Sequence, residues 1–292
     1  MGKNIKKGNI KRANQKIFFG IFRLFSLIVV LVLFVILGFI TIKGFSVISW
    51  KFLTTMPTEG MTEGGILPAI VGTLSLVLGS MILAFPIGVM SAIYLNEYAP
   101  HPWLKNFVRT MTNNLAGIPS IVFGLFGMAL FVNTLKFGDS IIAGSCTLAL
   151  LALPVIIRTT EEALFAIDDS YRHASLALGA TKWQTIRKVV MPMAFPNIIT
   201  GLILSIGRVS GETAPILFTA AAYFLPKLPH SIFDQVMALP YHLYVITTSG
   251  TEITKTRPIA YGTALVLIML VLITNIIANI IRRYYNKKYK LN

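Results

Sequence analysis

Long apolar stretches separated by short polar segments run through this chain. A helix needs about 20 mostly apolar residues to cross the hydrocarbon layer of a bilayer, and six stretches approach or exceed that length. The third and fourth are short or interrupted by glycine and proline. The pattern predicts an all-α polytopic membrane protein with about six transmembrane helices, at about residues 17–42, 66–95, 115–133, 139–158, 196–222 and 258–281.

The basic residues predict on which side each connection lies. With the N-terminus inside, the inner segments carry 18 of the 26 Lys and Arg residues and the outer segments carry six. This bias follows the positive-inside rule and predicts a multi-pass cell-membrane protein with both termini in the cytoplasm. A single transmembrane domain, residues 17–281, then lies between basic cytoplasmic tails at 1–16 and 282–292. The first apolar stretch is too long for a signal-peptide core and lacks its cleavage site, so we expect a retained span.

The composition agrees with a membrane protein. The chain is 55% hydrophobic and 13% charged, whereas soluble domains carry about 25% charged residues. Its net charge of +15 could indicate nucleic-acid binding. Most basic residues, however, lie in tails and loops beside apolar stretches, so we expect contact with membrane lipid headgroups and no nucleic-acid partner.

Few residues suggest catalysis or metal binding. The single cysteine, Cys146, allows no disulfide within the chain and no site built on thiols. His101, His230 and His242 have no spacing typical of a metal site or a catalytic triad, and we expect them at surfaces or interfaces. No nucleophile–base pair is evident, so the chain is predicted to be no enzyme and to bind no metal.

Residues 159–192 form the longest predicted cytoplasmic segment. Thr159 and Glu162 have capping-box spacing, which predicts that a new helix begins at Thr159. Asp168 or Asp169 is predicted to cap the following helix.

The second half of this segment is predicted to turn at a glycine. Gly179 can end the helix that precedes it, because glycine adopts the left-handed conformation easily. Thr181 is predicted to cap another helix, which Pro192 would close. Both helices have an apolar face, which could either pack back on the membrane domain or bind a soluble partner.

The spacing in this loop resembles the EAA loop of ABC-importer permeases. That pattern is Glu-Ala-Ala, three residues, Gly, nine residues, Ile, one residue, Leu-Pro. The spacing is kept here, with His for Glu as the main departure. The resemblance implies that the loop couples to an ATPase through His173, Ala174, Ser175, Gly179, Ala180 and Pro192.

The resemblance also implies where the energy comes from. In that family the loop forms a coupling helix that sits in a groove of an ATP-hydrolysing subunit. This chain has no G-x-x-x-x-G-K-[ST] phosphate loop, so ATP and Mg²⁺ are expected on a partner subunit, and no cofactor is expected on this chain.

Two opposite charges lie in the fifth apolar stretch. Each charge at the centre of a membrane helix costs roughly 2.5–3.5 kcal/mol on insertion scales. Arg208 and Glu212 are four residues apart, close enough to pair on one helical face. Gly201, Ser205 and Pro215 continue the same stripe if the stretch is one helix.

Two interpretations of this stripe remain open. The Arg208–Glu212 pair could hold helices together, or it could line a path for an anion together with Ser205. A guanidinium offers five donors in a planar fork, which suits a tetrahedral oxyanion. Glu212 would then limit how tightly the anion is held.

Two further runs resemble phosphate importer permeases of the Pst type. They are GRVSGETAPILFTA, which contains Arg208 and Glu212, and LPVIIRTTEEAL at residues 153–164. The ending ETAPILFT resembles the A-type subunit more than its C-type partner. The resemblance implies a type I ABC importer permease that moves inorganic phosphate. Implied partners are a homologous second permease subunit, a dimer of ATP-binding subunits and an extracytoplasmic phosphate-binding protein.

The same resemblance makes Arg158 a candidate anion contact on the exit side. From its position alone, Arg158 could equally be a basic residue reaching the interface at a helix end. The alternative functions are a permease for sulfate or molybdate, which are also tetrahedral, and a stand-alone ion-coupled transporter or channel.

Two other segments carry weaker signals. The run AGIPSIVFGLFG at residues 116–127 is interpreted as a broken helix, which membranes tolerate only when it is buried in protein. The outer segment at about residues 223–257 is too apolar for a free loop. It could form a folded cap on the bundle or meet the external binding protein.

Overall fold

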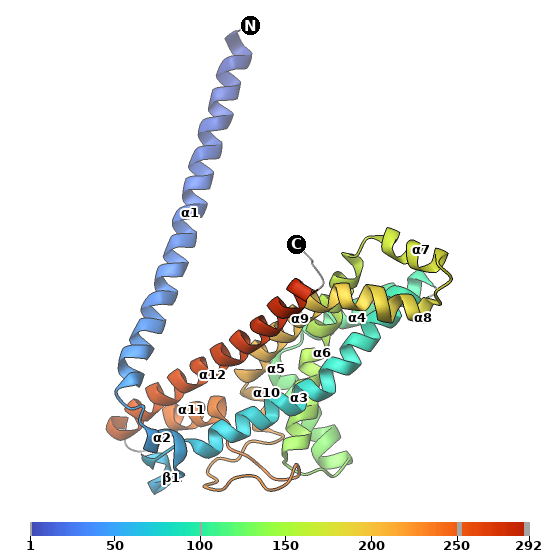
Figure 1. Cartoon of the computed structure of the whole chain (residues 1–292). Coiled ribbons are helices and arrows are strands. Elements are labelled where there is room, and N and C mark those ends of the chain that lie inside the picture. The colour runs from blue at the N-terminus through green and yellow to red at the C-terminus, as the bar shows by residue number, and fades with distance from the viewer. Residues whose placement is uncertain (1, 100, 250–252, 289–292) are drawn as a thin grey trace.

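Long apolar helices are the main feature of the structure. It is a computed structural model that describes residues 2–99, 101–249 and 253–288. Within these residues five helices are long and apolar enough to cross a membrane. Their main parts are the helices α1 (Gly2–Phe45), α3 (Leu67–Ile93), α6 (Ile141–Phe165), α9 (Met191–Ser210) and α12 (Ile253–Lys288) (Figure 1).

A bent pair of helices makes a sixth span if the two helices are counted as one. Helix α4 (Pro102–Ala116) meets α5 (Ser120–Gly127) at an angle of 100°, and α5 continues as the π-helix η3 (Met128–Thr134). The break falls in the GIPS run, so the predicted broken helix is confirmed. Pro119 takes the N-cap position of α5 with a φ of −57°, which lies in the range that its ring fixes. The predicted all-α fold with about six spans is therefore confirmed.

The shorter elements lie at the two ends of the bundle. The end that carries α7 is called the α7 end, and the opposite one the α11 end (Figure 1). At the α7 end are η2 (Tyr94–Tyr98), α7 (Asp169–Ala177), α8 (Lys182–Thr185) and η4 (Ile186–Val190). Toward the α11 end are α2 (Trp50–Thr54), η1 (Glu59–Met61), α10 (Ala214–Leu217), α11 (Leu239–Thr248) and the antiparallel pair β1 (Pro57–Thr58) and β2 (Glu63–Gly64).

Helix α6 forms the centre of the bundle, and glycines let its neighbours approach closely. On α3, a Cβ at Gly88 would lie 2.7 Å from Cγ2 of Ile156 on α6. On α9, a Cβ at Gly201 would overlap the side chain of Thr159. Small residues at membrane-helix interfaces allow such backbone contact, so these glycines fix the spacing of α3, α6 and α9.

This packing gives a prediction about Gly201. The change Gly201→Ala is expected to lower the stability of the protein, because overpacking a closely packed site costs about 1–3 kcal/mol. The matched control is Gly207→Ala on the same helix, where an added Cβ meets only Nδ2 of Asn275, at 4.0 Å. Thermal unfolding in detergent should show a lower Tm for Gly201→Ala only. Equal Tm values for the two variants would contradict the packing argument.

The prediction that a new helix begins at Thr159 is wrong. Helix α6 continues from Ile141 to Phe165, and Oγ1 of Thr159 donates a hydrogen bond to the carbonyl of Val155 within the helix, at 2.8 Å. The fourth span is therefore longer than 139–158. The helix continues because its polar last turns have partners: Glu161, for example, pairs with Arg109 of α4.

The prediction that Pro192 closes a helix is also wrong. One helix runs without interruption from Lys182 to Ser210, through α8, η4 and α9. Its π-turn explains this, because the N–H of Met191 donates to the carbonyl of Ile186, five residues back. Pro192, which has no N–H, lies in the first turn after this shift and does not end the helix.

The predicted fifth span is broken where one helix was expected. Helix α9 ends at Ser210, and the N–H of Glu212 donates to the carbonyl of Val209 in a closing turn, at 3.2 Å. Pro215 lies in the first turn of the separate helix α10, a position that suits its fixed φ. Gly201, Ser205 and Arg208 thus share α9, whereas Glu212 and Pro215 do not belong to that helix.

The segment after α10 forms a folded cap at the α11 end. Its backbone is bonded to α6, where the N–H of Ile141 donates to the carbonyl of Asp234. It is also bonded to itself, because the N–H of Ala222 donates to the carbonyl of Val236. The expectation that His242 lies at a surface or interface of the protein is wrong. Its side chain is 2% exposed, and Nδ1 lies 3.4 Å from Oγ1 of Thr263 on α12.

Helix α1 leaves the bundle toward its N-terminus (Figure 1). It contacts α12 only near its C-terminal end, where the rings of Phe39 and Tyr261 pack edge to face. The helix begins at Gly2, so the basic segment expected as a tail at residues 1–16 continues the first span as a helix. Residues 289–292 of the other basic tail lie outside the described residues.

Candidate transport site and docking loop

Arg208 and Glu212 form the predicted ion pair, although Glu212 lies beyond the helix end. Nε of Arg208 lies 3.7 Å from Oε1 of Glu212. A cation in the last turn of a helix is favoured by the partial negative charge of that end. The distance indicates charge attraction without a good hydrogen bond, so the donors of the guanidinium remain available for an anion.

Glu212 also borders a small cavity between α3, α6, α9 and α11. The cavity has a volume of about 10 Å³, close to the smallest space that holds one water molecule. Its wall includes Leu76 and Val77 of α3 and Ala238 before α11. The bundle is thus closely packed beside Glu212 on the α11 side.

Ser205 lies one turn before Arg208 but faces the interior. Its side chain is 0% exposed, and its Oγ has no hydrogen-bond partner among the described residues. The side chain of Arg208 is 37% exposed. In this conformation the hydroxyl of Ser205 is therefore enclosed, and its predicted role on an anion path stays a prediction.

Arg158 lies in a polar cluster at the α7 end. Its Nη1 donates to Oδ1 of Asn113 at 2.7 Å, and its Nε donates to Oε1 of Glu162 at 3.3 Å. Beside it, Nε of Arg109 donates to both carboxylate oxygens of Glu161, at 3.2 and 3.4 Å. These residues line an open pocket of about 360 Å³.

The two arginines named as pathway residues lie at different depths. Gly201 packs against Thr159, which follows Arg158, and Arg208 lies seven residues further along α9. A rise of 1.5 Å per residue puts Arg208 about 10 Å closer to the α11 end. A groove of about 320 Å³, lined by Thr159, Asn197 and Thr200 among others, lies between α6 and α9 toward the α7 end. Neither arginine lines it, but Glu162 borders both this groove and the pocket at Arg158.

The helix ends of the loop follow the sequence signals. The carboxylate of Asp168 accepts a hydrogen bond from the N–H of Ser170 at 2.8 Å and caps α7. Hydrogen bonds from the side chain and backbone of Ser170 lower the pKa of this carboxyl. Gly179 has a φ of +82°, and Thr181 forms a capping box with Gln184. All three predicted capping roles are confirmed.

The loop presents apolar side chains outward. Within the described chain α7 has no buried residue, so its apolar face does not pack back on the bundle. We call the docking face the exposed set Tyr171, His173, Leu176, Leu178 and Trp183. Leu178 is 90% exposed.

The residues named for ATPase coupling divide into three groups. His173 and Ala174 are exposed on α7, and Gly179 is exposed at the turn. Ser175 and Ala180 stabilise the turn: Oγ of Ser175 lies 2.9 Å from Oγ1 of Thr185, and the N–H of Ala180 donates to the carbonyl of Ser175. Pro192 lies within the long helix, away from the docking face.

The sequence analysis did not predict the polar cluster around Arg158. Glu161 and Glu162 stand in the TTEEAL run, whose paired carboxylates next to Arg158 were a usable signal. Arg109 and Asn113 gave no such signal, because α4 lies about 50 residues away in sequence.

The described residues contain no group of three or more His, Cys, Asp or Glu that could hold a metal ion.

Known proteins resemble this chain in sequence. The family described as "Binding-protein-dependent transport system inner membrane component" matches residues 84–291. The probable ABC transporter permease protein YqgI of Bacillus subtilis is 34% identical over 97% of this chain and 99% of its own length. The phosphate transport system permease protein PstA of Mycobacterium leprae is 40% identical over 80% of this chain and 75% of its own length.

A solved structure shares the fold. A bacterial alginate ABC transporter, in complex with an alginate pentasaccharide-bound periplasmic protein, contains a chain that matches with a TM-score of 0.61 and 14% identity. The match covers 91% of this chain and 94% of that one, which confirms the predicted ABC importer permease fold. With most of its length matched by the family and by full-length relatives, this chain belongs to the binding-protein-dependent transport system inner membrane components.

Proposed function

We propose that this chain is the membrane-spanning subunit of an ATP-driven importer that moves inorganic phosphate into the cytoplasm. The observation that carries the proposal is the 40% identity, over 80% of the chain, to a relative named as a phosphate transport system permease protein. Other relatives at 32–41% identity are also named as certain or probable phosphate transport system permease proteins.

The chemistry of the two arginine sites supports an oxyanion as the cargo. Each guanidinium is only partly neutralised, Arg208 by Glu212 and Arg158 by Glu162. A phosphate could therefore be held by free donors at each level and still leave, because the neighbouring carboxylates reduce the net positive charge. Arg208 would be the deeper contact and Arg158 the contact on the exit side.

The α7 end is proposed to face the cytoplasm. Most basic residues of the connections lie there, as the positive-inside rule requires. The docking face would then meet one of two ATP-binding subunits, which hold ATP and Mg²⁺. A homologous second permease subunit would complete the transport path, and a phosphate-binding protein would deliver the anion at the α11 end, where the folded cap lies.

Uptake of labelled phosphate tests this proposal. Liposomes that contain the chain with its second permease subunit and ATP-binding subunits should accumulate phosphate when ATP and the binding protein are supplied. A large excess of unlabelled phosphate should suppress the signal, whereas sulfate and molybdate should not. Equal suppression by sulfate or molybdate would indicate another oxyanion, and flux through the chain alone would indicate a stand-alone transporter.

A further inference from the structure

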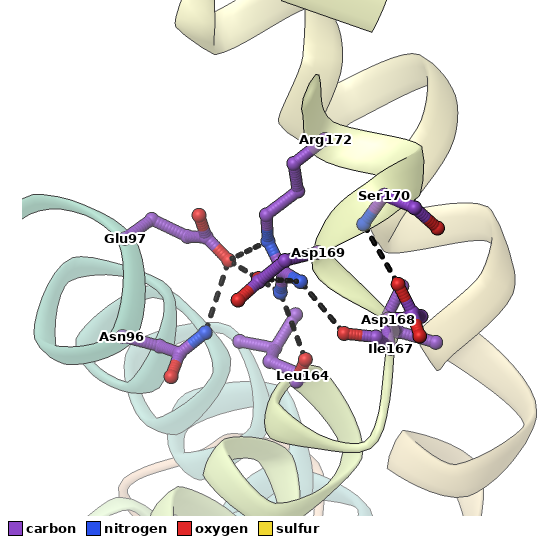
Figure 2. A network of polar contacts seen from close by, with 8 residues as sticks. All are labelled: Asn96, Glu97, Leu164, Ile167, Asp168, Asp169, Ser170 and Arg172. Atoms are coloured by element: carbon purple, nitrogen blue, oxygen red, sulfur yellow. Dashed lines mark hydrogen bonds and ion pairs between the residues drawn. The ribbon is translucent and has the colours of Figure 1, made fainter. Parts of the chain in front are cut away.

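A largely enclosed ion pair joins α7 to η2, which continues α3 (Figure 2). Nε and Nη2 of Arg172 on α7 donate to Oε1 of Glu97 in η2, at 3.3 and 3.0 Å. The side chains are 14% and 8% exposed. Nδ2 of Asn96 donates a hydrogen bond to the same carboxylate oxygen, at 3.0 Å. These two partners are the least exposed ion pair described in this chain, although α7 itself is exposed.

The same guanidinium also holds the end of α6. Nη2 of Arg172 donates to the carbonyl of Leu164 at 2.9 Å, and Nη1 donates to that of Ile167 at 2.8 Å. Leu164 lies in the last turn of α6, where carbonyls lack partners within the helix. Its carbonyl accepts from Arg172 and, at 3.3 Å, from the N–H of Ile167, which follows the helix end. One side chain therefore connects α7, the C-terminal end of α6 and the end of α3.

A second contact links the other half of the loop to the same segment. Nζ of Lys182 on α8 lies 5.0 Å from the ring centroid of Tyr98 in η2, a cation–π contact. The Ser175–Thr185 hydrogen bond joins α7 to the last residue of α8. The loop thus holds η2 at two points and is stabilised internally between them.

Helix α3 extends from this contact to the site beside Glu212. It continues into η2 without a break, as a span from Leu67 to Tyr98. Its other half supplies Thr73, Leu76 and Val77 to the wall of the small cavity that Glu212 borders. A continuous helix packed on α6 can therefore transmit a displacement of η2 to that cavity.

We propose that Glu97 is a positioning residue that transfers the movement of the docking loop to α3, through its ion pair with Arg172. This inference rests on the proposed coupling of the loop to an ATPase. When the ATPase moves α7, Glu97 makes the end of α3 follow, and the packing beside Glu212 changes. Without this pair, the loop could move while α3 stays in place.

Alanine substitutions of the two carboxylates on Arg172 test the proposal. In Glu97→Ala, phosphate taken up per ATP hydrolysed is expected to fall about tenfold, within the 5–150-fold range typical of coupling between sites. The matched control is Asp169→Ala. Asp169 contacts the same guanidinium at 3.0 Å, but its side chain is 79% exposed and belongs to α7 itself, so uptake should stay within about twofold. Glu97→Gln keeps an acceptor oxygen and should be intermediate.

Hydrogen exchange gives a readout that does not depend on the transported solute. In the assembled complex, trapping the ATPase with ATP and vanadate should change exchange at residues 94–98 in the wild type and in Asp169→Ala. In Glu97→Ala this response should be lost while the ATP-binding subunits still co-purify. If wild-type liposomes take up no phosphate, the proposed function fails, but the exchange response still tests Glu97.

Three results would overturn the inference. The first is a normal exchange response and normal coupling in Glu97→Ala, which would leave the pair without a role in transmission. The second is an equal loss of coupling in Glu97→Ala and Asp169→Ala, which would assign the carboxylate to neutralising Arg172. The third is loss of the ATP-binding subunits with Glu97→Ala alone, which would assign it to folding.

Discussion

Replacing Arg208 with alanine is expected to reduce phosphate uptake by a factor of about 10–100, with an unchanged amount of assembled complex. A hydrogen bond to a charged group contributes about 1.5–3 kcal/mol, and 1.4 kcal/mol corresponds to a factor of ten. The donors of Arg208 are poorly used by Glu212 at 3.7 Å, so their loss falls on the anion and not on helix packing. Uptake of labelled phosphate, normalised to co-purified ATP-binding subunits, measures the effect.

Two companion variants separate an anion path from a packing role. Arg208→Lys keeps the charge but loses the planar fork, and we expect it to recover part of the uptake. Glu212→Gln should retain more uptake than Arg208→Ala, because the arginine remains. If the pair only held helices together, Glu212→Gln would be as harmful as Arg208→Ala, and both would lower the yield of the complex.

Replacing Gly179 with valine is expected to uncouple or detach the ATPase. Gly179 has a φ of +82°, and a β-branched residue held in an unfavourable backbone region costs about 1–3 kcal/mol. The space around Gly179 is open, with no atom within 4 Å of an added Cβ, so the effect comes from backbone strain alone. The strain would change the angle between α7 and α8 and disperse the docking face. Co-purification of the ATP-binding subunits and transport-linked ATP hydrolysis should both fall.

Gly179→Asn is the control for that strain. Asparagine adopts the left-handed conformation more readily than other non-glycine residues, so this variant should keep most of the coupling although its side chain is as large as that of valine. Similar losses in both variants would mean that side-chain size, through contact with the partner, matters more than the backbone turn.

The features that the sequence predicted well depend on short stretches of chain. The spans follow from local hydropathy, and the caps at Asp168, Gly179 and Thr181 follow from side-chain chemistry within four residues. The loop resemblance also rests on such local spacing. Each of these signals is complete within one segment, so no knowledge of tertiary contacts was needed.

The features that the sequence did not predict depend on residues far apart in the chain, or on local signals that neighbouring segments override. Glu97 and Arg172 are 75 residues apart, and Arg109 and Glu161 are 52 apart, so neither pair has a periodic signature. The end of α9 at Ser210 was hidden because the apolar run continues beyond it. Pro192 gave a local stop signal, which the preceding π-turn overrides by shifting the hydrogen bonds.

The unbroken helix from Lys182 to Ser210 has a consequence for timing. Its first turn lies in the docking loop and its last turn carries Arg208, about 39 Å away at 1.5 Å per residue. The proposed ATPase contact and the proposed anion contact Arg208 then lie near the two ends of one continuous helix. The π-turn Ile186–Val190 and the prolines Pro192 and Pro196 mark where this helix can bend. A displacement of the docking loop that leaves these points straight should move Arg208 in the same step. A lag between ATP binding and movement of Arg208 would indicate bending at the π-turn or at these prolines, or a delay in the other helices.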